Sequence, residues 1–278
     1  MTAKALIIAG YGLNCEEESA YAFEQVGFNA EICHINDLIE APEKLKSTQA
    51  LCIPGGFSYG DDTGSGNAFA QKMRLTLQDK LIEFISRDTL TIGICNGCQI
   101  AVNLGLVPVR GDEYGKRSVA VTHNENARYQ CRWVDLQTTE SHSPWLQNID
   151  SLHIPVAHGE GRFMMNDDTL ANLKENKQIA LRYSKDDKPA NGEFPFNPNG
   201  STDDIAGITD PSGRVLVLMP HPERGMFTWQ RDDYAILKDT ARRNGKPLAE
   251  SSDGLQIFQN AAKYFGVDGQ NLNMKKVG

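Results

Sequence analysis

Short apolar runs alternate with helical patterns through the first hundred residues, and this alternation limits the possible folds more than any other feature of the chain. Runs of strand length occur at residues 4–9, 29–34, 50–54 and 90–94. Helical patterns lie between and after these runs, at residues 16–26, 67–86 and 96–104. Because neighbouring parallel strands need a crossover connection, usually a helix, the alternation predicts an α/β fold built on a parallel sheet.

Beyond residue 110 the alternation breaks down into strands separated by turn-rich pieces. Further strands are predicted at residues 128–136, 152–157 and 215–219, and a last amphipathic helix from Asp253. We find no internal repeat and no linker. The sequence therefore predicts one three-layer α/β/α sandwich around a mostly parallel central sheet. Residues 1–278 would form a single domain with a helical C-terminal extension from about residue 228.

The overall charge and apolar pattern argue against several classes of function. The 28 Lys and Arg residues face 36 Asp and Glu residues, and no run of five basic residues occurs, so we expect no nucleic-acid partner. The longest apolar stretch near the N-terminus, residues 5–9, is too short for a signal peptide or a membrane span. We therefore expect a cytoplasmic protein without a membrane partner, whose six cysteines are mostly reduced.

The most informative motif runs from Gly93 to Gly97 with the form G-x-C-x-G, after a predicted strand and before a predicted helix. This is the cysteine counterpart of the nucleophile elbow, in which a sharp turn needs small residues on either side. The turn would place Cys95 at a helix N-terminus, where backbone N–H groups lower the pKa of a thiol and can stabilise an oxyanion. Cys95 is the predicted nucleophile.

Two alternatives to a nucleophile remain at this point. Cys95 could be an ordinary buried thiol, since free cysteine is among the most buried residue types. Cys95 and Cys98 also form a C-x-x-C motif, which is typical of redox proteins and likewise opens a helix after a strand. The elbow alone does not separate hydrolysis from dithiol chemistry.

The triplet His221-Pro222-Glu223 favours hydrolysis. Proline favours an extended backbone at the residue before it, and in an extended chain residues two apart face the same way. Glu223 could then hold the His221 imidazole in one tautomer and stabilise its cation, which is what a cysteine nucleophile requires of its base. A dithiol oxidoreductase has no need for such a pair.

A glycine pair, Gly55-Gly56, follows the third predicted strand. Paired glycines let backbone N–H groups approach a ligand closely, although a tight turn would use the same residues. Adjacent parallel strands would bring this loop beside the elbow. The N–H groups of Gly56 and Asn96 are therefore the predicted oxyanion hole.

Three segments together resemble the class I, triad-type glutamine amidotransferases: PGGFS at 54–58, GICNGCQ at 93–99 and HPE at 221–223. Further segments resemble the family of glutaminase subunits of phosphoribosylformylglycinamidine synthase, an enzyme of purine biosynthesis: AHGEG at 157–161, NPNGS at 197–201, IAGI at 205–208 and MPHPER at 219–224. The segment LNCE at 13–16 is similar to that family's TNCD, with changes at both ends.

This resemblance implies a flavodoxin-like amidotransferase fold with Cys95 as nucleophile, His221 as base and Glu223 as the orienting acid. It implies that Gln99 contacts the glutamine substrate. It also implies that ammonia passes to a synthetase that binds ATP, magnesium and formylglycinamide ribonucleotide, often with a small third subunit. No cofactor is expected in this chain. A catalytically silent regulatory module is the remaining alternative, and the intact set of three residues argues against it.

Among the other histidines only His158, within AHGEG, is a candidate for the site, and we favour a structural or partner contact for it. The remaining histidines lack the spacing of zinc ligands, so no metal site is predicted. No G-x-x-x-x-G-K-[ST] motif occurs, so ATP is not expected on a P-loop of this chain.

Overall fold

The structure is a computed structural model that describes residues 3–111 and 113–267. Its main sheet has ten strands: β1 (Lys4–Ala9), β2 (Asn29–His34), β3 (Ala50–Ile53), β4 (Leu90–Ile94), β6 (Gln130–Thr138), β7 (Ser151–His158), β9 (Ile179–Lys185), β10 (Lys188–Pro189), β11 (Ile205–Thr209) and β12 (Val215–Leu218). Their order is β2-β1-β3-β4-β12-β11-β9-β6-β7, with β10 paired to β9. A separate small sheet pairs β5 (Ala120–Thr122) with β8 (Arg162–Met164).

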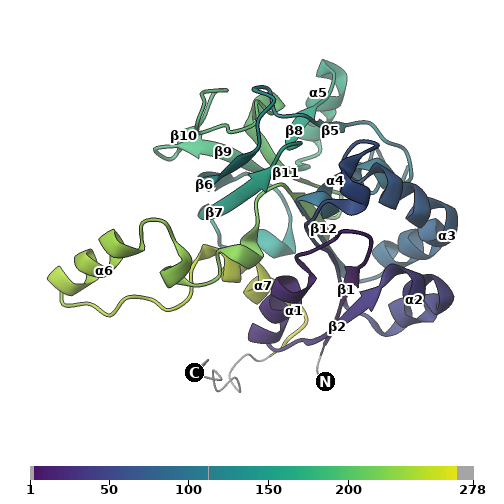
Figure 1. The fold of residues 1–278 in the computed structure, drawn as a ribbon, viewed down its shortest axis with the longest axis horizontal. Helices are drawn as coiled ribbons and strands as arrows, with labels where there is room; N and C mark the ends of the chain where they lie inside the picture. The colour runs from purple at the N-terminus through teal and green to yellow at the C-terminus, as the bar shows by residue number, and fades with distance from the viewer. Residues whose placement is uncertain (1–2, 112, 268–278) are drawn as a thin grey trace.

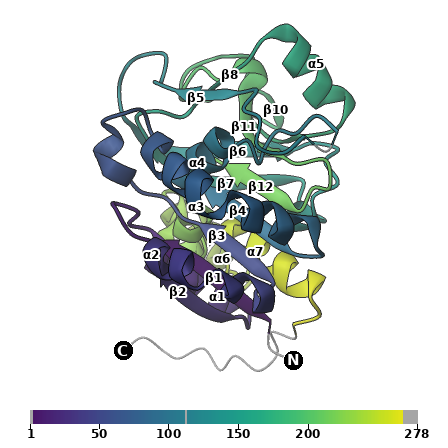
Figure 2. The same ribbon diagram turned by 90° about the vertical axis from the view of Figure 1, so that its right-hand side faces the viewer.

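Helices cover both faces of this sheet, as Figures 1 and 2 show. The α-helices of the described residues are α1 (Glu16–Gln25), α2 (Ile35–Glu40), α3 (Asn67–Ser86), α4 (Asn96–Leu104), α5 (Asp167–Glu175), α6 (Tyr234–Arg243) and α7 (Asp253–Tyr264). Helices α3 and α4 pack together on one face, and α1 and α7 lie on the other. The predicted three-layer α/β/α sandwich is confirmed.

The sheet is parallel where the candidate site lies and antiparallel beyond it. Strands β2, β1, β3, β4 and β12 pair in parallel, whereas β11, β9, β6 and β7 pair antiparallel. In the parallel part, Ile53 of β3 pairs with Gly93 of β4, and Ile94 pairs with Leu218 of β12. Three chain segments therefore leave the sheet side by side at the carboxyl ends of these strands, the edge where ligands bind in α/β folds.

Helix α3 shows why the first part of the chain was predictable. Its buried residues recur at helical spacing and include every residue predicted for its inner face: Ala70, Met73, Leu77, Leu81 and Ile85. The predicted strand at residues 50–54 ends one residue early, at Ile53, and the predicted helix at residues 16–26 ends at Gln25. Such shifts of one residue are ordinary at element ends.

The C-terminal part leaves the body of the molecule and returns. Helix α6 has no buried residue and stands away from the sheet in Figure 1. Helix α7 returns to the core, where Phe258 lies edge-on to Phe23 of α1 at a ring-centroid distance of 5.1 Å. The single-domain prediction for residues 1–278 stays a prediction. Within residues 3–111 and 113–267, no helix is both long enough and apolar enough to cross a membrane.

Candidate active site

Cys95 lies at the turn between β4 and α4, as the motif predicted. It adopts φ 51° and ψ −105°, a backbone conformation that costs free energy for any residue with a side chain. The strain is held in place because its N–H donates to Leu218 O at 2.8 Å and its own carbonyl oxygen accepts from Gln99 N at 3.1 Å. The thiol is buried and lies 3.7 Å from Ala157 O. Cys95 therefore opens helix α4 with its sulfur held at the carboxyl end of β4.

The two flanking glycines are both needed for close packing. A Cβ at Gly97 would lie 1.8 Å from Ile53 O, so helix α4 could not approach strand β3 with any larger residue there. A Cβ at Gly93 would lie 2.8 Å from Gly97 O, on the other side of the same turn. Glycine is thus required at these two positions because backbone segments pack directly against each other there, and not because the turn needs flexible residues.

His221 and Glu223 form a buried hydrogen-bonded pair. Nδ1 of His221 lies 2.6 Å from Oε1 of Glu223, and both residues are almost fully buried. The contact was predicted, but the reason given for it was wrong. Residues Pro222–Arg224 form a 3₁₀ turn rather than an extended chain, and this turn brings the carboxylate back to the ring. Nε2 of His221 is buried without a hydrogen-bond partner in the described residues.

The charges around the ring favour a protonated imidazole. Burial by itself would lower the pKa of His221, but the carboxylate of Glu223 and the thiols of Cys95 and Cys15 outweigh burial and raise this pKa well above its usual value. The residues around His221 are thus arranged to stabilise an imidazolium. That is the form a base takes after it accepts the proton of a cysteine nucleophile.

The glycine loop after β3 contacts this pair directly. A Cβ at Gly55 would lie 2.8 Å from Cε1 of His221, so only glycine fits beside the ring. The carbonyl of Gly55 accepts hydrogen bonds from the backbone N–H groups of Asn14 and Cys15, at 3.0 and 3.2 Å. Gly56, at φ 153°, donates no backbone hydrogen bond among the described residues. Its N–H is therefore unoccupied, as the prediction of an oxyanion donor requires.

Asn96 and Gln99 lie in the first turn of α4 and their side chains are bonded to each other. Nδ2 of Asn96 donates to Oε1 of Gln99 at 2.7 Å, and Oδ1 of Asn96 accepts from Ser58 N at 3.1 Å. Nε2 of Gln99 donates to Glu160 O. Both polar ends of Gln99 are thus engaged. Each end keeps one further hydrogen-bonding position, and a contact between Gln99 and substrate glutamine stays a prediction.

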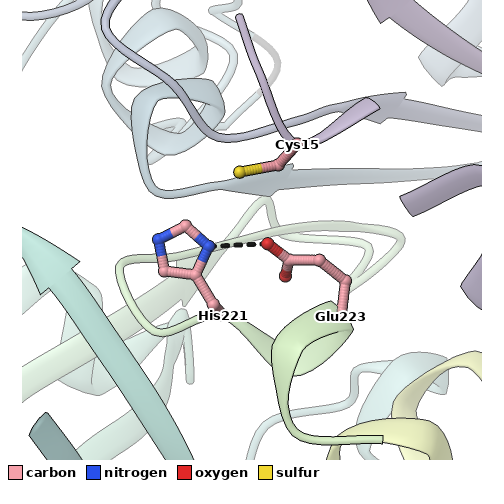
Figure 3. A group of neighbouring side chains, drawn as sticks. All are labelled: Cys15, His221 and Glu223. Carbon is pink, nitrogen blue, oxygen red and sulfur yellow. Dashed lines mark hydrogen bonds and ion pairs between the residues drawn. The ribbon is translucent and has the colours of Figure 1, made fainter. Parts of the chain in front are cut away.

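Cys15 is the residue of this site that the sequence reasoning missed. Its sulfur packs beside His221 and Glu223 (Figure 3), and it accepts a hydrogen bond from Nη2 of Arg224 at 2.9 Å. Burial raises the pKa of the Cys15 thiol. The segment LNCE contained the only sequence signal, as a similarity to a family motif, because Cys15 and His221 are too far apart in the chain for a spacing argument.

His158 and Cys98 are buried close to the site without belonging to the His221–Glu223 pair. Nδ1 of His158 lies 3.2 Å from Oδ1 of Asn124, and burial lowers the His158 pKa to about 3. The ring is therefore neutral in the folded chain, and the structural or partner role favoured for it stays a prediction. Cys98 is fully buried in α4, and burial raises its pKa well above the usual value. A thiol in that environment is a poor partner for dithiol exchange.

Two clusters among the described residues have the ligand types for a metal ion. One is Cys15 with His221 and Glu223, all buried. The other is His153 with Asp232 and Asp233, at the base of the α6 segment and partly exposed. Exposed acidic groups are common without an ion, so the second cluster alone indicates no site.

Comparison with known proteins agrees with this geometry. A family model described as a CobB/CobQ-like glutamine amidotransferase domain matches residues 2–265. The chain is 48% identical over 264 residues to phosphoribosylformylglycinamidine synthase subunit PurQ of Methanococcus maripaludis, covering 94% of this chain and 97% of that one. It is 39% identical over 262 residues to the subunit of the same name from Dehalococcoides mccartyi, with the same coverage.

A solved structure agrees as well. A chain in the structure of PurLQS from Thermotoga maritima matches with a TM-score of 0.68 at 29% identity, covering 95% of this chain and 100% of that one. Since the family model spans most of the chain and the relatives match over nearly their whole length, the alternative of a redox protein built on C-x-x-C is set aside. The chain belongs to the glutamine amidotransferase family, in the group of phosphoribosylformylglycinamidine synthase PurQ subunits.

Proposed function

We propose that this chain is the glutaminase subunit of a phosphoribosylformylglycinamidine synthase in the purine pathway of the cytoplasm. It hydrolyses glutamine to glutamate and ammonia through Cys95, His221 and Glu223. The ammonia passes to a synthetase subunit that converts formylglycinamide ribonucleotide to formylglycinamidine ribonucleotide. The relatives are named as subunits, and the Thermotoga maritima structure is named for an assembly, which supports a partner of this kind.

One observation supports the chemistry most strongly. A strained, buried cysteine at a helix N-terminus shares a site with a buried His–Glu pair whose surroundings favour the imidazolium. Nucleophile, base and orienting acid are the three parts that thiol-based amide hydrolysis requires. They come from the ends of β4 and β12, two neighbouring parallel strands.

The steps follow from these positions. His221 takes the Cys95 proton on Nε2, and the thiolate attacks the amide carbon of the glutamine side chain. The N–H groups of Gly56 and Asn96 stabilise the resulting oxyanion. His221 then gives its proton to the departing nitrogen, so that the C–N bond breaks and ammonia leaves a γ-glutamyl thioester on Cys95. A water molecule, deprotonated by His221, hydrolyses the thioester to glutamate.

ATP and magnesium are expected on the synthetase and not on this chain. We also infer that the isolated chain hydrolyses glutamine slowly until the synthetase docks. Docking would activate it by moving the Gly55–Gly56 loop, which is held by the segment around Asn14. A tenfold activation needs a docking free energy that differs between two loop states by about 1.4 kcal/mol.

Steady-state glutaminase assays test this function. We expect glutamate release by the chain to rise when the synthetase, its nucleotide and formylglycinamide ribonucleotide are added at saturating glutamine. Formylglycinamidine ribonucleotide should then form with Cys95 intact and should fail to form from glutamine with Cys95→Ala. Free ammonium salt should rescue the variant, because the synthetase itself is unaltered. Glutamine-dependent product with Cys95→Ala would contradict the proposal, and equal turnover with and without the synthetase would remove only the activation claim.

A further inference from the structure

A second thiol completes a compact cluster around the His221–Glu223 pair, as Figure 3 shows. Cys15 Sγ, one ring nitrogen of His221 and one carboxylate oxygen of Glu223 all lie within 4.8 Å of one another. The three residues are 1%, 2% and 1% exposed. Thiolate, imidazole and carboxylate are the groups that bind Zn²⁺ in proteins. The proposed hydrolysis uses the His–Glu pair but leaves Cys15 without a role.

The ligand atoms of these three residues lie close enough together for a small metal ion to replace the proton between His221 and Glu223. Nδ1 of His221 and Oε1 of Glu223 lie 2.6 Å apart, and the proton that they share lies between them. Bonds of about 2.0–2.3 Å around a tetrahedral zinc ion place its ligand atoms about 3.3–3.7 Å apart, so small side-chain shifts suffice. The other carboxylate oxygen of Glu223, Oε2, is buried and has no hydrogen-bond partner in the described part of the chain. It could therefore bind an ion without losing an existing bond.

We propose that Cys15, His221 and Glu223 form an inhibitory site for a thiophilic divalent cation, Zn²⁺ above all. The inhibition rests on the proposed function, because His221 must be the base of the hydrolysis. The ion replaces the proton on Cys15 Sγ, which leaves the site, and it binds Nδ1 of His221, whose proton moves to Nε2. The ring then carries its one proton on Nε2. His221 then cannot accept the proton of Cys95, and hydrolysis stops while the ion is bound.

Arg224 and Asn14 control access to the cluster. Nη2 of Arg224 lies 2.9 Å from Cys15 Sγ, and a guanidinium cation at that distance opposes a second cation. Oδ1 of the exposed Asn14 lies 3.3 Å from the same sulfur. Asn14 thus offers an oxygen as a fourth ligand and marks a short path from solvent. Removing the charge of Arg224 should consequently strengthen binding of the metal ion.

Cobalt binding tests the site separately from catalysis. We would titrate Co²⁺ into the full chain carrying Cys95→Ala and follow the sulfur-to-cobalt charge-transfer absorption. One Co²⁺ per chain is expected, displaced by Zn²⁺. Adding Cys15→Ser should abolish the absorption, whereas adding Cys131→Ser, at an exposed cysteine, should leave it unchanged. Adding Arg224→Gln should strengthen Co²⁺ binding several-fold.

Inhibition is then measured in the chain with Cys95 intact, as the ratio of glutaminase rates with and without Zn²⁺. Cys15→Ser should raise the zinc concentration for half-inhibition at least about tenfold, since even residues that only support metal ligands cost about 10–100-fold in affinity when changed. A cobalt absorption that persists in Cys15→Ser, or is absent in Cys95→Ala, would place the ion elsewhere and overturn the proposal.

If Cys15→Ser does not fold, Co²⁺ binding by the Arg224→Gln variant tests the proposed metal site instead. Co²⁺ binding that is unchanged or weaker in that variant would contradict the proposed site. Failure of the chain to hydrolyse glutamine would overturn the proposed function instead. In that case the cobalt result would still stand, so the two failures are distinguishable.

Discussion

The hydrogen bond between His221 and Glu223 is the contact on which the candidate site depends most at the scale of single residues. It holds a proton on Nδ1, so that Nε2 is the nitrogen that exchanges protons in the proposed mechanism. In the proposed mechanism the carboxylate only orients and stabilises the ring, whereas the imidazole itself transfers protons. These unequal roles give the first prediction.

Glu223→Gln should lower the glutaminase kcat by less than His221→Ala does. A general acid–base group contributes about 10²–10⁴-fold to a rate, so His221→Ala should lose a factor in that range. Both variants should unfold cooperatively, which circular dichroism against urea would show. The measurement is kcat with the synthetase present at saturating glutamine. A Glu223→Gln enzyme as fast as wild type would mean that the buried carboxylate has no catalytic part.

His158 gives a prediction about acid stability. Its pKa falls from 6.5 to about 3 in the folded chain because the ring is buried. The unfolded chain therefore takes up a proton below about pH 6.5 that the folded chain does not. Stability from this residue is present above pH 6.5 and is lost as pH falls towards 3, at up to about 1.4 kcal/mol per pH unit.

Urea unfolding at several pH values checks this slope. His158→Asn should show a shallower fall in unfolding free energy between pH 6 and pH 4 than wild type does. His142→Asn, at an exposed histidine, is the matched control and should keep the wild-type slope. Equal slopes for all three proteins would show that His158 is not the group that resists protonation.

The sequence predicted Cys95, His221 and Glu223 but not Cys15, and the reason is physical. The first three stand in short motifs whose spacing has a local meaning, a turn or a side-by-side pair. Cys15 joins them only because its loop is hydrogen-bonded to Gly55, at the end of another strand. Contacts between distant loops depend on the order of strands in the sheet, which no local pattern contains.

At the scale of elements, the parallel half of the sheet was predictable because each buried strand is followed by an amphipathic helix. In the antiparallel half, β6 and β7 correspond to the strands predicted at residues 128–136 and 152–157, whereas β9 and β11 were not predicted. Strand β11 is short and contains Gly207, its register against β9 is irregular, and its flanking segments are turns. Helix α5 buries a single residue and was not predicted, whereas α6 buries none but lies within the helical extension predicted from about residue 228.

The docking of α4 on β3 gives a prediction at this scale. Gly97→Ala should destabilise the fold by about 3 kcal/mol or more, because the new Cβ would overlap Ile53 O, a backbone atom that cannot turn aside. Gly159→Ala is the control, since its nearest neighbour would lie 3.8 Å away, at ordinary contact distance. Thermal and urea unfolding would compare the two variants. A stable Gly97→Ala protein would contradict the close approach of α4 to β3.

For the whole molecule, the segment around α6 should be removable. Its ends meet, because Phe227 and Ser251 pair as an isolated bridge and Thr228 N donates to Glu250 O at 3.0 Å. Replacing residues 231–249 with a short glycine-serine linker should change the unfolding free energy by no more than about 1–2 kcal/mol, because partly exposed ion pairs are each worth little. The excision removes ion pairs of this kind, such as the one between His153 and Asp232.

Truncation after residue 252 is the contrasting control for this excision. It removes α7, whose Ile257 and Phe258 are fully buried, and should prevent cooperative folding. Urea denaturation of both proteins decides the point. An excision variant that also failed to fold would show that the segment contributes to the core.

Identification of the residue that carries the γ-glutamyl group tests the account most directly. The chain would be mixed with glutamine, quenched in acid during turnover, digested and examined by mass spectrometry. The account predicts the adduct on Cys95 alone, with neither adduct nor hydrolysis in Cys95→Ala. An adduct on Cys15, Cys98 or Cys131, together with continued hydrolysis by Cys95→Ala, would contradict it.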